Sequence, residues 1–260
     1  MAKTQRTISD VVREMMAGLP EVEEVESHGW PNFRVRGKTF AIYMINFHGD
    51  GRVALYLRAP AGAQAVFAKM LPRAYFVPPY VGPRGWLGAE LDKGLGWGTI
   101  CGHVRDAYEM VAPAELVRAV PKGFRVPPPT RKFRPEEIDR FQGKAAQAVL
   151  KKLDAICLPL PETSPSAKFG APMWIVGKKT FVSTHYYTGR LKLSFWVSAA
   201  QQTKLVKHKR YEVSRYTGHN GWIDLDVEKR QDWEEIKELA IGSYRHFALK
   251  RMLKALDSKK

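Results

Sequence analysis

Cysteine is scarce in this chain of 260 residues, and it occurs in no paired motif. The two cysteines, Cys101 and Cys157, lie far apart, and neither belongs to a Cys-x-x-Cys pair. Two isolated thiols point away from a disulfide-stabilised secreted domain and indicate a reducing compartment, which we expect to be the cytoplasm. Each cysteine is therefore predicted to be a small buried apolar residue.

Long apolar segments and the common catalytic motifs are also missing. No apolar run approaches the roughly 18–20 residues that cross a bilayer, so no membrane partner is expected. The seven histidines include no His-x-x-x-His or His-Glu-x-x-His pair, and the chain has no Gly-x-Ser-x-Gly, P-loop or dinucleotide fingerprint. The acidic run from Glu21 to Glu26 is loosely spaced and unrepeated, which argues against a metal site. The sequence predicts no catalytic residue, metal or cofactor, and it points away from an enzyme.

What the chain does contain is one pattern that occurs twice. The segment from Gly29 to Phe40 returns from Gly170 to Phe181, and the segment from Tyr80 to Leu87 returns from Tyr216 to Ile223. A third block repeats three residues of a predicted helix: Trp97, Ile100 and Tyr108 return as Trp233, Ile236 and Tyr244. A period this long indicates a duplicated domain and not a solenoid, whose repeats span about 20–50 residues.

Hydrophobic periodicity predicts the same order of elements in each copy. The first copy is expected to contain a helix at residues 8–19 with its N-cap at Ser9-Asp10, strands at 21–26, 33–36, 39–44 and 52–57, and helices at 61–70 and 97–111. Short extended pieces are expected at 75–80 and 85–91. The second is expected to contain helices at 135–157, 199–208 and 233–256, and strands at 173–176, 180–184 and 190–197.

A Pro-rich stretch at residues 121–134 separates the two copies. Its Pro127-Pro128-Pro129 run favours an extended conformation, so it is predicted to be a linker. The predicted domains are residues 1–120 and 135–260. The predicted fold class is α+β, with two tandem domains that each pack helices on one face of an antiparallel sheet.

The charge of the chain is one-sided. Residues 1–125 carry 16 Lys and Arg against 12 Asp and Glu, and the remainder carries 26 against 14, so the net charge of +16 divides into +4 and +12. An excess of this size attracts polyanions, nucleic acid first among them. A surplus that only aids solubility would give the same number.

Basic clusters on predicted hairpins, loops and one helix are the candidates for phosphate contact. The hairpin tips carry alternating cations opposite an apolar face, which suits phosphate contact but equally describes a solvated hairpin. The Gly-x-x-Gly-Trp loops could clamp a nucleic-acid backbone or could form turns that seat Trp86 and Trp222 in the core. The densest basic segment follows Lys204 on a helix and its exit loop. The candidate nucleic-acid-binding residues are Arg34, Arg36, Lys38, Arg84, Lys178, Lys179, Lys204, Lys207, Lys209, Arg210 and Arg215.

Tryptophans pair across the two copies, as Trp86 with Trp222 and Trp97 with Trp233. Exposed tryptophans can stack on nucleic-acid bases. Retention of the pairs within the duplication is explained more simply by core packing, which is what we predict.

The repeated elements resemble the MmcQ/YjbR family. The resemblance rests on the hairpin from Pro31 to Phe40, the loop from Tyr80 to Trp86 and the helix from Trp97 to Tyr108, and it is looser in the second half. It implies a fold similar to bacterial frataxin (CyaY-like) and a DNA-binding role through a double-wing arrangement of hairpins. Members of the family look like single domains, so a fused pair implies that one chain does the work of a dimer and favours a monomer.

We therefore expect a non-enzymatic protein that binds double-stranded DNA without strong sequence preference, mainly through backbone contacts made by its more basic second half. The alternative is a protein-interaction or small-ligand module with an incidental basic surface, and an enzyme of unrecognised type comes third. Gathering of the candidate cations on one surface would favour nucleic acid, and scattering would disfavour it.

Overall fold

The chain forms two compact units. A computed structural model describes residues 5–228 and 231–258, and contacts divide the chain into Met1–Ile138 and Asp139–Lys260. Each unit combines one six-stranded antiparallel sheet with helices, so the predicted α+β class with two tandem domains is confirmed. No helix within these residues is long and apolar enough to cross a membrane.

The first unit follows the predicted order with two additions. Its elements are α1 (Ile8–Ala17), β1 (Val22–Ser27), β2 (Trp30–Val35), β3 (Lys38–Ile45), β4 (Val53–Leu57), α2 (Ala63–Met70), β5 (Tyr75–Phe76), β6 (Leu87–Glu90), α3 (Trp97–Glu109), α4 (Ala114–Ala119) and α5 (Pro135–Ile138). The N-cap of α1 is Thr7 and not the predicted Ser9-Asp10, because Thr7 and Asp10 form a reciprocal capping box. The short helices α4 and α5 were not predicted as separate elements.

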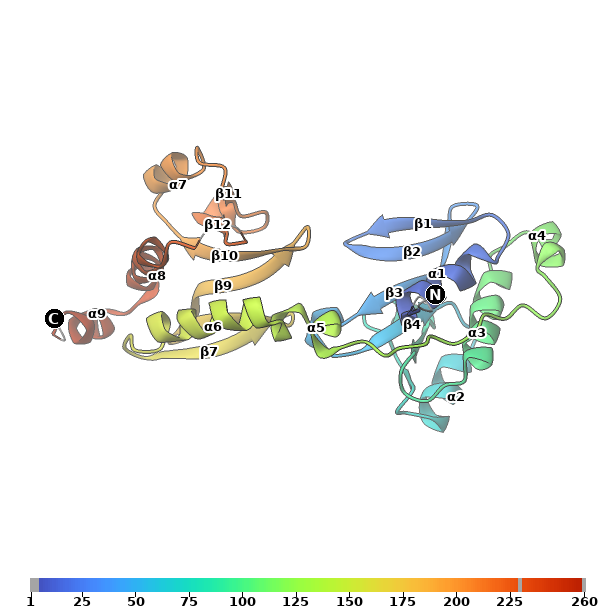
Figure 1. Cartoon of the computed structure of the whole chain (residues 1–260). Helices are drawn as coiled ribbons and strands as arrows, with labels where there is room; N and C mark the ends of the chain where they lie inside the picture. Colours follow the sequence, from blue (N-terminus) through green and yellow to red (C-terminus); the bar gives the residue numbers. More distant parts are fainter. Residues whose placement is uncertain (1–4, 229–230, 259–260) are drawn as a thin grey trace. The chain divides into compact units, whose positions relative to one another are not determined.

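The sheet of the first unit has the order β1-β2-β3-β4-β6-β5 and carries an apolar cluster on each face. Helices α1 and α3 pack against one face (Figure 1), where Phe33, Phe40 and Leu55 lie in the main core. Strand β4 is buried along its whole length, because Ala54 and Tyr56 face a second apolar cluster on the opposite side. A strand that is buried on both faces has a continuous apolar sequence, as β4 does.

The second unit repeats this topology with the sheet order β11-β12-β10-β9-β8-β7. Its elements are α6 (Lys144–Cys157), β7 (Thr163–Lys168), β8 (Ala171–Val176), β9 (Lys179–Tyr187), β10 (Arg190–Trp196), α7 (Ala199–Leu205), β11 (Tyr211–Val213), β12 (Trp222–Asp226), α8 (Trp233–Phe247) and α9 (Lys250–Asp257). Both cysteines are free and buried in the two cores, as predicted.

Two predicted helices of the second copy are interrupted. The helix expected at 135–157 breaks at Asp139 and again at Gly143, both of which are extended, and Gly143 caps α6. The helix expected at 233–256 breaks at Ala248 and Leu249, which are extended, and α9 then turns Met252 into the core. The apolar stripe runs on through the break at Ala248 and Leu249, so periodicity alone could not reveal it.

The Pro-rich segment between the copies packs on the first unit. Phe124, Val126 and Phe133 contact its main core, and Thr130 exchanges hydrogen bonds with the backbone of Arg6. The segment is extended, but apolar contacts hold it against α1 and its neighbours.

Candidate nucleic-acid interface

The β2–β3 hairpin orients its cations in different directions. Arg36 and Gly37 both have positive φ, of 48° and 74°, which ends β2 at Val35 and gives the two-residue turn that suits a twisted hairpin. The predicted alternation of Arg34, Arg36 and Lys38 on one face therefore stops at the turn. Arg36 forms an ion pair with Glu21, which raises the pKa of the guanidinium, whereas Arg34 donates to the Thr39 hydroxyl at 3.1 Å.

The Gly-x-x-Gly-Trp loop forms a tight turn in both copies, and glycine is required at each end. A Cβ on Gly82 would lie 2.5 Å from Val77 Cγ1, and Gly85 has a φ of 81°. The turn buries Trp86 in the second apolar cluster and leaves Arg84 exposed at its tip. The turn therefore packs Trp86 into the protein and also exposes the Arg84 side chain.

Three cations converge on one hollow beside this turn, which we call the basic hollow. Lys38 comes from the start of β3, Arg58 from the residue after β4, and Arg84 from the turn. The hollow has a volume of about 390 Å³. It is lined by Asn32, Gly37, Lys38, Thr39, Ile42, Arg58, Val81, Arg84 and Trp86. No carboxylate is among these residues, and within residues 5–228 and 231–258 no acidic side chain forms an ion pair with the three cations.

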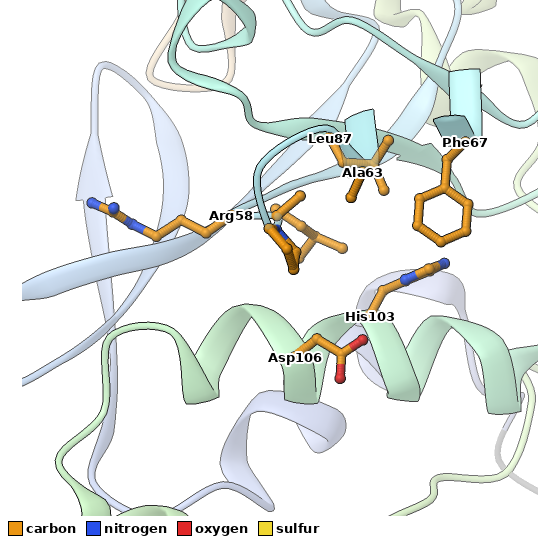
Figure 2. Close-up of a pocket in the computed structure, with 9 residues that line it drawn as sticks. Arg58, Ala63, Phe67, Leu87, His103 and Asp106 are labelled. Carbon is orange, nitrogen blue, oxygen red and sulfur yellow. The ribbon is translucent and has the colours of Figure 1, made fainter. Parts of the chain in front are cut away.

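Arg58 is fixed in place, although sequence reasoning did not single it out. Its Nε donates to the Thr39 carbonyl at 2.8 Å, and its guanidinium carbon lies 5.3 Å from the centroid of the Trp86 ring. Figure 2 shows the guanidinium directed away from Phe67 and His103, which line a second pocket to which Arg58 also contributes. The basic hollow therefore brings together the predicted Lys38 and Arg84 with Arg58, which the sequence did not indicate. Arg34 donates a hydrogen bond to Thr39, one of the lining residues.

In the second unit most candidate lysines are exposed and spread over several elements. Lys178 and Lys179 lie at the β8–β9 turn, Lys204 lies on α7, and Lys207 and Lys209 lie in the turn that follows it. The strand register matches Lys179 with Lys38, but Trp196 and Asn220 occupy the positions of Arg58 and Arg84. The convergence of cations seen in the first unit is not repeated here.

Arg210 serves the fold of the second unit. It forms an ion pair with Glu235, and its Nη1 is buried without a hydrogen-bond partner among the described residues. Burial and the Glu235 hydrogen bond also raise the pKa of the neighbouring Tyr211. The charge of Arg210 is therefore compensated by Glu235 within the unit, unlike the charges of the exposed lysines near it.

Arg215 belongs to an exposed set of aromatic and basic side chains. Its guanidinium carbon lies 5.9 Å from the Tyr187 ring centroid and 5.7 Å from that of Tyr216. The ammonium of Lys192, which is buried beneath this set, lies 5.1 Å from the Tyr187 ring. Cations and rings in this geometry stabilise one another by cation–π attraction.

The sheet face behind this set is polar, although the same face of the first unit is apolar. Ser194 donates to Asp224 at 2.7 Å, His185 lies 3.4 Å from the same carboxylate, and Lys192 pairs with Glu212. Burial alone would raise the pKa of Asp224, but the hydrogen bonds from His185 and Ser194 lower it below its ordinary value. The strand register places His185, Lys192, Ser194, Glu212 and Asp224 where the first unit has Met44, Ala54, Tyr56, Phe76 and Gly88.

The second pocket has a volume of about 260 Å³ and lies between α2, α3 and the end of β4 in the first unit. Figure 2 shows His103 and Asp106 on α3 facing Ala63 and Phe67 on α2. His103 Nε2 lies 2.7 Å from the Tyr75 hydroxyl, and burial lowers the pKa of the imidazole. A hollow lined mainly by apolar side chains, with His103, Asp106 and Arg58 at its edge, can hold a small molecule with an apolar body.

Three of the four paired tryptophans pack against an apolar cluster as predicted, and Trp222 does not, within the part of the chain that the structure describes. Trp86 is buried, Trp97 and Trp233 pack against the two main cores, and Trp222 is partly buried beside Phe247. None of the four therefore offers a fully exposed ring for base stacking.

Comparisons with known proteins support the duplication of one domain. The YjbR family model matches residues 17–110 and again residues 158–246, while no curated protein matches the chain. Among solved structures, the crystal structure of Deinococcus radiodurans protein DR2400, which contains a DUF419 domain, matches 46% of this chain and 88% of its own. That match has 17% sequence identity and a TM-score of 0.37. Because the family model matches each copy separately, the chain belongs to the YjbR family and carries its domain twice.

Proposed function

We propose that this chain is a non-enzymatic protein that binds the phosphate backbone of double-stranded DNA with low sequence preference. The observation that supports the proposal is the convergence of Lys38, Arg58 and Arg84 on one hollow without a carboxylate. The three cations come from a strand, a strand end and a turn, and Lys and Arg side chains are the groups that contact backbone phosphates. The exposed lysines of the second unit and the net charge of +16 add attraction at longer range.

The test is fluorescence anisotropy of a labelled 20-base-pair duplex across a series of salt concentrations. We expect log K to fall linearly and steeply with log salt, because each phosphate contact releases counterions. The double variant Lys38→Glu/Arg84→Glu should bind about tenfold more weakly or worse, with a salt slope shallower by about two. Failure to bind the duplex at low salt would refute the proposal.

Arg36 gives a matched control on the same hairpin. Its charge is already compensated by Glu21, so Arg36→Gln should change the affinity for the duplex by less than about twofold. The contribution of the second unit to duplex affinity is measured with two further variants, Lys178→Glu/Lys179→Glu and Lys204→Glu/Lys207→Glu. An Arg36→Gln loss as large as that of the double variant would mean that the basic hollow is not the contact site.

A second candidate function is the binding of a small molecule with an apolar body, and the pocket beside His103 favours it. Titration calorimetry with small aromatic compounds tests it, with Ala63→Leu as the variant that fills the pocket. Binding to the wild type that Ala63→Leu abolishes would support this function, and an unchanged affinity in the variant would exclude this pocket.

A further inference from the structure

Two tyrosines at matching positions of the duplicated domain are strongly exposed. Tyr80 is 70% exposed and Tyr216 is 81% exposed, and each lies two residues before the first glycine of its Gly-x-x-Gly-Trp turn. Repeated tryptophans of the two copies pack into the protein, whereas these repeated tyrosines do not. Core packing therefore does not explain why both copies carry a tyrosine here.

The loops that carry them are firmly held. In the first unit, the Gln64 side chain donates to the carbonyl oxygens of Gly82, at 2.9 Å, and Trp86, at 2.6 Å. Gln202 makes the same pair of bonds in the second unit, at 2.9 Å to Gly218 and 3.2 Å to Trp222. Tyr80 also has a φ of +63°, a conformation that is uncommon for a non-glycine residue. The exposed rings thus project from clamped turns.

Each exposed tyrosine lies beside side chains from the neighbouring hairpin or from its own loop. The Tyr80 ring centroid is 6.0 Å from that of Phe47 and 5.9 Å from that of His48, both of which follow β3. Tyr216 lies beside Arg215, which spans to Tyr187 at the end of β9. The first copy thus has a ring cluster of Tyr80, Phe47 and His48, and the second has two rings, Tyr216 and Tyr187, joined by Arg215. We call these two sets the stacking platforms.

The surroundings of the platforms are basic. Arg84 follows Tyr80 within the same turn and lines the basic hollow, and the exposed Arg215 lies between Tyr216 and Tyr187. Proteins that hold single strands combine aromatic rings for the bases with cations for the backbone. A duplex keeps its bases stacked inside, so only an unpaired base can reach an exposed ring.

We propose that the two stacking platforms bind unpaired bases, so that the protein holds single-stranded nucleic acid as well as duplex. The inference rests on the proposed function, since the phosphate contacts of the basic hollow would hold the strand whose bases reach the platform of the first unit. One chain then offers two base-stacking sites, one in each copy of the domain. Tyr80 and Tyr216 are the central residues, and Phe47 and Tyr187 support them.

The experiment compares three labelled 20-mers by fluorescence anisotropy: oligothymidylate, an abasic oligomer with the same phosphates, and the duplex. The wild type should prefer oligothymidylate to the abasic oligomer. Tyr80→Ala/Tyr216→Ala should weaken oligothymidylate binding by about tenfold or more and leave the abasic and duplex affinities within about twofold. Tyr80→Phe/Tyr216→Phe should restore the wild-type affinity, because the ring and not the hydroxyl makes the contact.

Met110→Ala/Leu249→Ala is the control, since both side chains are exposed and apolar but neither belongs to a platform. Equal affinity of the wild type for oligothymidylate and the abasic oligomer would overturn the inference. Wild-type affinity of Tyr80→Ala/Tyr216→Ala for oligothymidylate would overturn it too. If the protein binds the duplex but does not distinguish oligothymidylate from the abasic oligomer, only this inference is refuted. If it binds none of the three oligomers, the proposed function is refuted as well.

Discussion

The hydroxyl of Tyr108 donates a 2.8 Å hydrogen bond to the carbonyl oxygen of Pro20, and this bond joins α3 to the turn that ends α1. The second unit repeats it, with Tyr244 donating to Pro161 at 2.9 Å. Both tyrosines are fully buried and belong to the helix that is repeated between the copies. The bond is thus a shared structural element of the duplicated domain.

Removal of either hydroxyl should destabilise the unit to which it belongs. Tyr108→Phe leaves a carbonyl oxygen without its partner, so we expect a loss of about 1 kcal/mol in the free energy of unfolding. Tyr56→Phe is the matched control, because the Tyr56 hydroxyl is buried with no hydrogen-bond partner among the described residues. That change should be neutral or stabilising. Calorimetry or urea unfolding measures both, and equal losses from the two variants would contradict the assignment.

Arg210 and Lys209 are neighbours in sequence with different expected roles. Arg210→Ala breaks a partly buried ion pair with Glu235, so the second unit should lose about 1–2 kcal/mol of stability. Lys209→Ala removes an exposed charge and should change stability by less than about 0.5 kcal/mol. Thermal unfolding compares the two. A stable Arg210→Ala protein with weakened DNA binding would instead give Arg210 the contact role that its charge suggested.

The sequence predicts those parts of the fold that depend on local pattern and repetition. The alternation of Phe33 and Val35 and the turn signal at Gly37-Lys38 mark the first hairpin, although the structure places the turn one residue earlier, at Arg36-Gly37. The repeated blocks carry the topology to the second unit. Strand β7 was missed because Thr163–Lys168 is polar, contains Pro165 and lies mostly exposed at a sheet edge. Nothing in its own residues distinguishes it from a loop, and only its pairing with β8 makes it a strand.

The candidate site was predictable only in part, for the same reason. Lys38 and Arg84 stand out as cations at turns, but their closeness to Arg58 depends on how three elements meet. The polar face of the second unit depends on register, which brings Ser194 and Asp224 side by side across β10 and β12. Neither relationship is encoded in sequence spacing, although the repeat did place Tyr80 and Tyr216 at one position.

The Pro-rich segment should show an acid-dependent contribution to stability through Glu137. Arg131 binds both carboxylate oxygens of Glu137 at 2.7 Å, and together with the Arg134 backbone amide it lowers the pKa of this carboxyl to about 2. A carboxyl with a lowered pKa in the folded state stabilises fully above its ordinary value of 4.5 and ceases to do so as pH falls through about 2.

Glu137→Gln tests this dependence against the wild type. The wild type should be more stable by about 0.5–1 kcal/mol at neutral pH, a figure reduced for solvent screening. The difference should narrow below about pH 4.5 and vanish near pH 2. Urea unfolding at a series of pH values measures it, and a difference that stays constant down to pH 2 would show that charge is not its cause.

Two helical glycines offer sites where the chain can be made more stable. A Cβ added at Gly102 in α3 or at Gly242 in α8 would meet no atom within 4 Å, and neither residue has a positive φ. Gly102→Ala and Gly242→Ala should each raise stability by about 0.5–1 kcal/mol, because alanine loses less backbone entropy on forming a helix. Gly82→Ala is the contrasting variant, since its Cβ would clash with Val77 and disturb the turn that presents Arg84. We expect Gly82→Ala to lower both the melting temperature and the affinity for DNA, and an unchanged melting temperature would mean that the turn tolerates a Cβ at this position.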